Sequence, residues 1–158
     1  MPIEPPSSRL FTLLRAAAHL GNQKSEADLV QAILIDAVAA LEAQRGVVAL
    51  ADETDHLQVR AKVGDTSGRV HFSHTLGERC FQGGESILCA ADDEPADLAP
   101  GEMASVMCLL LRTPRRRFGV LHLDRDRRQP PFTRDDLQFA DALATMLAIG
   151  IEGPGTGS

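Results

Sequence analysis

Two aromatic residue types are absent from this 158-residue chain, which contains no Trp, no Tyr and only six Phe. Base-stacking platforms, aromatic cages for quaternary ammonium ligands and membrane-interface belts all depend on such side chains. The sequence therefore argues against these three kinds of site. It also disfavours a large planar cofactor held by stacking, because an interior cavity would be lined by aliphatic residues, Cys, Met and His.

Cysteine is also scarce. Cys80, Cys89 and Cys108 form no Cys-x-x-Cys motif, and an odd, widely spaced set of this kind indicates reduced, intracellular thiols. No apolar run approaches the roughly 20 residues that a membrane-spanning helix needs. The N-terminal residues have neither the basic nor the apolar segment of a secretion signal. We therefore expect a cytoplasmic protein with no membrane partner.

The composition that remains is typical of one globular domain, with 44% hydrophobic and 24% charged residues. The formal net charge of −6, from 16 basic and 22 acidic residues, argues weakly against a polyanionic partner. Proline near the start and the Gly-Pro-Gly sequence near the end predict flexible ends. We therefore expect a linker at 1–7, a folded domain at 8–152 and a flexible tail at 153–158.

The periodicity of apolar residues predicts an α+β fold. Helices are expected at 8–20, 25–44, 73–82 and 133–152, with Ser25 and Thr133 as N-caps. Strands are expected at 47–51, 57–63, 86–89, 105–112 and 118–124. This order predicts a central antiparallel sheet of five to six strands, with the long terminal helices on one face. The short helix and an acidic loop would cover the other face, where a small-molecule cavity would form.

Five segments of the chain resemble a GAF domain of the bacterial type found beside FHA domains, histidine kinases or sigma-54-type activators. They are Arg45-Gly-Val-Val-Ala-Leu, Gly84-Glu-Ser-Ile-Leu-Cys-Ala-Ala-Asp92, Ser105-Val-Met-Cys-Leu-Leu-Leu, Phe118-Gly-Val-Leu-His-Leu-Asp124 and Phe132-Thr-Arg-Asp-Asp-Leu. The resemblance covers residues 8–152. It implies a non-catalytic sensory domain with a ligand cavity on one face of the sheet. It also implies terminal helices that dimerise and carry a signal to an output domain.

The candidate ligand-binding residues lie on or beside the short helix and on the strands facing it. His122 alternates with Leu121 and Leu123, so it should project to the face opposite these leucines, into the cavity; the alternative is a hydrogen-bonded core histidine. The complete set of candidates is Phe72, His74, Leu76, Cys80, Cys89, Asp92, Met107, Cys108 and His122.

Other groups of residues allow a bland and a functional interpretation. The cysteines are either small buried hydrophobes or redox-active thiols. His71 and His74 have metal-compatible spacing, but no further ligands are defined, so we predict no metal site. Arginine is concentrated near 112–128, where it could belong either to solvated turns or to an anion-binding patch. We do not expect direct nucleic-acid binding, because the sequence shows no recognition helix and no aromatic residues for base stacking. Alanine-rich helix faces could pack against a core or a second copy (Ala37, Ala39, Ala40, Ala142, Ala144 and Ala148).

These patterns predict a sensory GAF domain that binds a small ligand and signals to an output domain, in cis or in trans, as a homodimer. We assign no catalytic residue, and neither the ligand nor any cofactor can be identified. The first alternative is a thiol-dependent reductase of the free methionine sulfoxide reductase type, built on Cys80, Cys89 and Cys108. In the alignment with that type, the first cysteine would fall near Gly77 rather than at Cys80. The second alternative is a ligand-free dimerisation module.

Overall fold

The computed structural model describes residues 6–22, 25–64, 74–90, 105–126 and 128–153. Its centre is a five-stranded antiparallel sheet with the strand order β2-β1-β5-β4-β3. The predicted α+β class is therefore confirmed, with five strands. The strands are β1 (Arg45–Ala51), β2 (Leu57–Gly64), β3 (Ile87–Ala90), β4 (Ser105–Arg112) and β5 (Arg117–Arg125), and the helices are α1 (Pro6–Gly21), α2 (Glu26–Ala40), α3 (His74–Gly83) and α4 (Arg134–Glu152).

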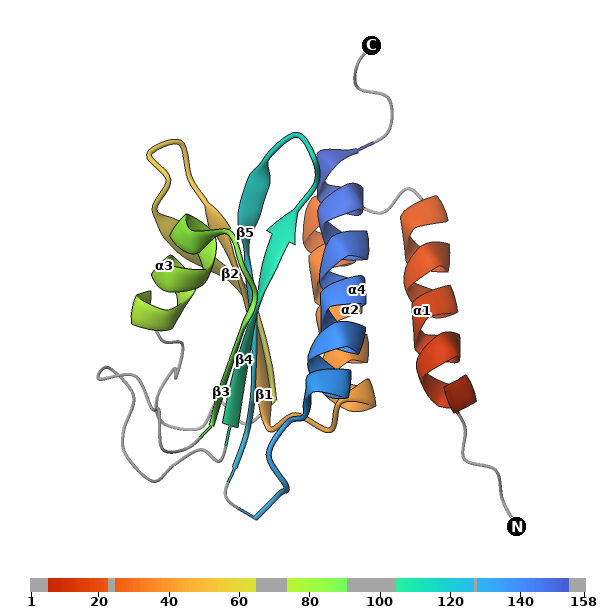
Figure 1. The fold of residues 1–158 in the computed structure, drawn as a ribbon. Coiled ribbons are helices and arrows are strands. Elements are labelled where there is room, and N and C mark those ends of the chain that lie inside the picture. The colour runs from red at the N-terminus through yellow and green to blue at the C-terminus, as the bar shows by residue number, and fades with distance from the viewer. Residues whose placement is uncertain (1–5, 23–24, 65–73, 91–104, 127, 154–158) are drawn as a thin grey trace.

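The elements form layers (Figure 1). Helices α2 and α4 cover one face of the sheet, α3 lies on the opposite face, and α1 packs outside α2 and α4. The larger apolar cluster lies between the sheet and the helices α2 and α4, with residues such as Ile33, Leu121 and Leu143 fully buried. The predicted separation of the terminal helices from the short helix is confirmed. The acidic loop predicted beside α3 lies outside the described residues.

Local hydrogen bonds fix the starts of two helices where the sequence predicted them. The Ser25 hydroxyl accepts a hydrogen bond from the Asp28 amide at 3.1 Å. Thr133 and Asp136 form a reciprocal capping box, with side-chain-to-amide distances of 3.1 and 2.8 Å. Helix α1 begins at Pro6, two residues before the predicted start, because proline fits the first turn of a helix without loss of a hydrogen bond.

Tertiary contacts end α2 earlier than the sequence predicted. The helix stops at Ala40 rather than near Gln44, and Glu42 has a positive φ of 51°. The Arg125 guanidinium donates two hydrogen bonds to the Leu41 carbonyl, at 2.6 and 3.2 Å, and the Gln44 amide donates to the Asp124 carbonyl at 2.7 Å. These partners come from β5, so no local pattern announces them.

Gly46 lies between the predicted helix at 25–44 and the predicted strand at 47–51, and it is the second residue of β1. A Cβ at this position would approach the Val38 side chain to 2.6 Å and the Leu34 side chain to 2.8 Å. Glycine therefore allows β1 to pack closely against α2.

Candidate functional site

The sheet separates two apolar clusters, and the smaller one faces α3. Its buried members come from α3 and from the strand residues that point toward it; they are Val47, Ala49, Leu57, Leu76, Cys80, Phe81, Cys89, Val106, Cys108, Leu110 and Val120. His122 lies directly across the strands from Cys108 and Val47, so it shares their face. The α3 face therefore brings together Leu76, Cys80, Cys89, Cys108 and His122 of the predicted ligand-binding residues.

Two other predicted residues, Met107 and His74, do not join this group. Met107 belongs to the cluster under α2 and α4. It precedes Cys108 in β4, and consecutive strand residues point to opposite faces, so the two could not line one cavity. His74 is the first residue of α3 and is exposed. Phe72 and Asp92 lie outside the described residues, as does His71.

The three cysteines are buried and form no disulfide bond with one another. The Cys80 thiol donates to the Cys108 carbonyl at 3.5 Å. The hydrogen bond with Cys80 is the largest cause, and burial the second, that raises the pKa of Cys108 well above the usual range of a thiol. Since the thiolate is the nucleophile and metal ligand, this environment favours the inert form. Within the described ranges, no three His, Cys, Asp or Glu side chains are arranged to hold a metal ion.

A buried polar network lies on the same face beside the cysteines. The His122 Nε2 donates to the Asp124 Oδ2 at 2.8 Å, and the Arg45 Nε donates to the Asp124 Oδ1 at 3.2 Å. His122 and Asp124 are fully buried, and the Arg45 side chain is 13% exposed. Neither Asp124 nor Arg45 was among the predicted ligand-binding residues. The two-residue spacing of His122 and Asp124 could have suggested Asp124, whereas Arg45 reaches it only through the pairing of β1 with β5.

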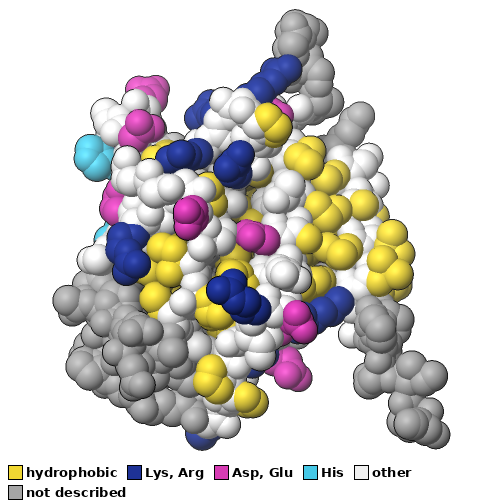
Figure 2. All heavy atoms as spheres, viewed as in Figure 1, with side chains coloured by type: hydrophobic (Ala, Val, Ile, Leu, Met, Phe, Trp, Pro, Cys, Tyr) yellow, Lys and Arg dark blue, Asp and Glu magenta, His cyan; other side chains and the backbone are white. Residues whose placement is uncertain are grey.

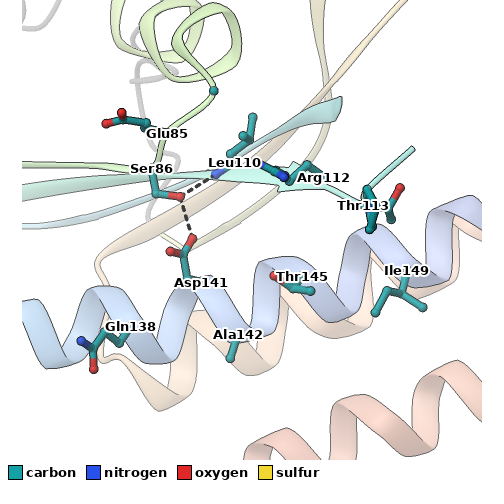
Figure 3. A pocket seen from close by; sticks show the side chains of 12 residues that line it. Glu85, Ser86, Leu110, Arg112, Thr113, Gln138, Asp141, Ala142, Thr145 and Ile149 are labelled. Atoms are coloured by element: carbon teal, nitrogen blue, oxygen red, sulfur yellow. Dashed lines mark hydrogen bonds between the residues drawn. The ribbon is translucent and has the colours of Figure 1, made fainter. Parts of the chain in front are cut away.

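A groove of about 650 Å³ lies elsewhere, between α4 and the end of β4. Figure 3 shows the Ser86 hydroxyl between the Leu110 amide and the Asp141 carboxylate, at 3.0 and 2.6 Å. Of the predicted ligand-binding residues that the structure describes, none lines this groove. No motif in the sequence pointed to it, since its walls come from three separate segments.

The described arginines near 112–128 contact different partners. Arg117 donates to the carbonyls of Phe81 and Gln82 at the end of α3, and Arg125 is buried against Leu41. Arg116 lies over the Phe118 ring, and Arg128 pairs with Asp126. The prediction of solvated turns is therefore wrong for Arg125, which is buried, and Arg117 caps the end of α3. Arg127 lies outside the described residues.

The sequence profile of the GAF domain family matches residues 25–153. No curated protein has a sequence that matches this chain.

Solved structures share the fold at low sequence identity. The GAF domain of an Acinetobacter phosphoenolpyruvate-protein phosphotransferase is 21% identical, with 92% of this chain and 93% of that one covered and a TM-score of 0.73. The free methionine-R-sulfoxide reductase of Neisseria meningitidis, solved with its substrate, is 15% identical, with coverage of 96% and 93% and a TM-score of 0.76. The phycocyanobilin-bound GAF domain of a cyanobacterial phytochrome is 13% identical, with coverage of 96% and 95% and a TM-score of 0.71.

Proposed function

Since the chain belongs to the GAF domain family, we propose that it is a cytoplasmic, non-catalytic sensory domain of bacterial signalling or transcription regulation. It binds a small ligand on the α3 face of the sheet and passes the signal through its terminal helices to an output domain. Two similar structures support a ligand-binding role, because one holds a bilin and the other a substrate. Of the described helices, none has the length and apolar character needed to cross a membrane.

The observation that carries this proposal is the chain of side chains from Arg45 through Asp124 to His122. Removing charged groups from water costs several kcal/mol per ion, and apolar residues of similar volume often give equal or better stability. The two fully buried members of the chain, His122 and Asp124, lie next to an otherwise apolar cluster. Ligand binding would explain why these buried polar groups are present despite their cost, since a few polar groups in a mainly apolar site fix the orientation of a bound ligand.

The test is native mass spectrometry of the purified chain, followed by dye-based thermal shifts with nucleotides, amino acids, methionine sulfoxide and phycocyanobilin. A bound mass, or a probe that raises the melting temperature, is the expected result. A ligand at 100 times its Kd stabilises by about 2.7 kcal/mol, or roughly 5–11 °C for a domain of this size. The proposal fails if no mass is retained and no probe shifts the transition.

A pair of variants locates the site. His122→Leu should remove the ligand-induced shift, because it deletes the polar group on the α3 face. Met107→Leu is the matched control on the opposite face, and it should keep the shift in full. Equal shifts in both variants would place the ligand elsewhere.

The helix α1 offers the surface for the proposed homodimer. Leu10, Phe11 and Leu14 are 57–61% exposed on this outer helix, and hydrophobic side chains gather on this side of the molecule (Figure 2). Ala37, Ala144 and Ala148, which were predicted to pack against either a core or a second copy, are fully buried in the core. We therefore place the homodimer contact on α1.

Sedimentation equilibrium tests this contact. A variant with Leu10→Ser, Phe11→Ser and Leu14→Ser should shift a dimer to monomer without loss of far-UV circular dichroism. A matched variant, Val59→Ser on β2, should leave the assembly unchanged. A wild-type chain that is monomeric at every concentration would contradict the dimer, while leaving ligand binding to its own test.

A further inference from the structure

Strand β4 extends beyond its neighbour at the edge of the sheet. The edge strand β3 pairs with β4 between Ile87–Ala90 and residues 105–108, so within the described part of the chain residues 109–112 of β4 have no strand beside them on that side. The Leu110 amide donates instead to the Ser86 hydroxyl at 3.0 Å. Because the N–H and C=O of one strand residue point the same way, the Leu110 carbonyl also faces this open side.

The main chain of Arg112 faces the same side. The Thr113 amide donates to the Arg116 carbonyl of the neighbouring strand connection at 3.0 Å, and successive residues of a strand direct their main-chain groups to alternate sides. The carbonyl of Leu110 and the amide and carbonyl of Arg112 therefore form a short row of hydrogen-bonding groups. This row lines the 650 Å³ groove.

The chain before β3 is held away from this row. Gly84 has a φ of +74°, and the Arg117 guanidinium packs against it while donating to the Phe81 carbonyl at 2.8 Å. These contacts fix the end of α3, and just before β3 the Ser86 side chain accepts the hydrogen bond from the Leu110 amide of β4. The residues before Ile87 therefore do not extend β3 along β4, and the groove lies beside Leu110 and Arg112 instead.

The opposite wall of the groove is helix α4 (Figure 3). It contributes Ala142, Thr145 and Ile149, of which Ile149 is 50% exposed. One end is bounded by the hydrogen bond between Ser86 and Asp141 at 2.6 Å, and the other by the bond between Thr113 and Glu152 at 2.9 Å. The exposed Arg112 side chain provides a cation near the second end.

We propose that the groove between the outer edge of β4 and α4 binds an extended peptide segment of a partner protein, which adds a short strand beside Leu110 and Arg112. An extended backbone supplies the donors and acceptors that an open strand edge lacks, and pockets beside the edge select alternate side chains. Small or β-branched side chains would pack on Ala142 and Ile149, and an acidic side chain would pair with Arg112. This site is separate from the α3 face.

The test begins with a displayed library of random dodecapeptides selected on the wild-type chain and counter-selected on Thr145→Trp, which fills the groove from an exposed position. The best enriched peptide is then labelled and its binding measured by fluorescence anisotropy. Thr145→Trp should weaken binding at least about tenfold, which corresponds to roughly 1.4 kcal/mol. Gln31→Trp, a control substitution at another exposed position on α2, should not weaken binding.

Two further measurements distinguish strand addition from ordinary side-chain binding. N-methylation of the peptide amides that face β4 should weaken binding about tenfold, and Arg112→Glu should disfavour peptides with an acidic residue. The Arg112 amide should also gain protection from hydrogen exchange. The proposal is overturned if no enriched peptide distinguishes wild type from Thr145→Trp, or if N-methylation leaves the affinity unchanged.

Discussion

Arg9 joins the outer helix α1 to α4, and its removal should loosen α1. Its guanidinium donates to the Asp136 carboxylate and, at 3.4 Å, to the Asp135 carbonyl. It also lies 4.9 Å from the centre of the Phe139 ring. The perturbation is a double-mutant cycle with Arg9→Met and Asp136→Asn. Methionine keeps an unbranched apolar stem, and asparagine keeps an acceptor for the Thr133 amide that caps α4.

The expected coupling follows from burial. The Arg9 side chain is 35% exposed and that of Asp136 only 10%. Exposed ion pairs contribute about 0.2–1 kcal/mol, and buried hydrogen bonds to charged groups about 1.5–3 kcal/mol. A pair between these limits should give a coupling of about 1 kcal/mol, or 2–4 °C in melting temperature for a domain of this size. The pair of Arg15 with Asp36 is the control, because Arg15 is 52% exposed and the contact is 3.3 Å. Its coupling should be about 0.3 kcal/mol.

The coupling should also depend on pH. Burial by itself would raise the pKa of Asp136, but the hydrogen bonds from Arg9 and Thr133 and the charge of Arg9 outweigh it and hold this pKa below its ordinary value of 3.8. A carboxylate with a lowered pKa stabilises the fold above its unfolded-state pKa and loses that contribution as the pH falls through the folded-state value. The coupling should therefore be constant from pH 7 to pH 5 and decline below about pH 4.

Urea unfolding followed by far-UV circular dichroism measures the cycle, since the chain has no Trp or Tyr for intrinsic fluorescence. Hydrogen exchange of the α1 amides gives the local effect: 1 kcal/mol corresponds to about fivefold faster exchange in Arg9→Met. A coupling no larger than that of the Arg15 control, or one that persists below the folded-state pKa of Asp136, would refute this account of how α1 is held.

Three other perturbations test the packing and the thiols. Gly119→Ala should lower the free energy of unfolding by about 3 kcal/mol, because its Cβ would lie 2.1 Å from the Ala49 carbonyl oxygen of β1. The control is Gly83→Ala, whose Cβ would have nothing within 4 Å; it should change stability by less than about 0.5 kcal/mol. Equal effects of the two variants in urea unfolding would contradict the close approach of β5 to β1. Gly150→Ala should lower the free energy of unfolding by about 1 kcal/mol despite the better helix propensity of alanine, since its Cβ would lie 2.5 Å from Leu20 and 2.3 Å from Leu29. A gain in stability would show that there is room for a methyl group between these helices. Cys108 should resist iodoacetamide at pH 8 in the native state and react after denaturation, because contact with Cys80 and burial raise its pKa; rapid native labelling would favour the reductase alternative.

Part of the candidate site could be predicted from the chain because strand alternation is a local property. Placing His122 on the face opposite Leu121 and Leu123 needed only the period of two, and the structure puts it beside Cys108. The same rule, applied to Met107 and Cys108, would have excluded Met107. The groove beside β4 could not be predicted, since it depends on where β3 stops pairing and on how close α4 lies.

The sequence by itself determined the elements and most of their limits. The predicted bounds of β4 match the structure, and the caps at Ser25 and Thr133 lie where their spacing placed them. These features depend on neighbours within a few residues, whose preferences are encoded locally. Tertiary structure decided the rest: the end of α2 is set by Arg125, 84 residues beyond Leu41. Likewise Arg45 meets Asp124 across 79 residues, through strand register alone. Such contacts depend on how the layers pack, a cooperative outcome of the whole core that no short pattern contains.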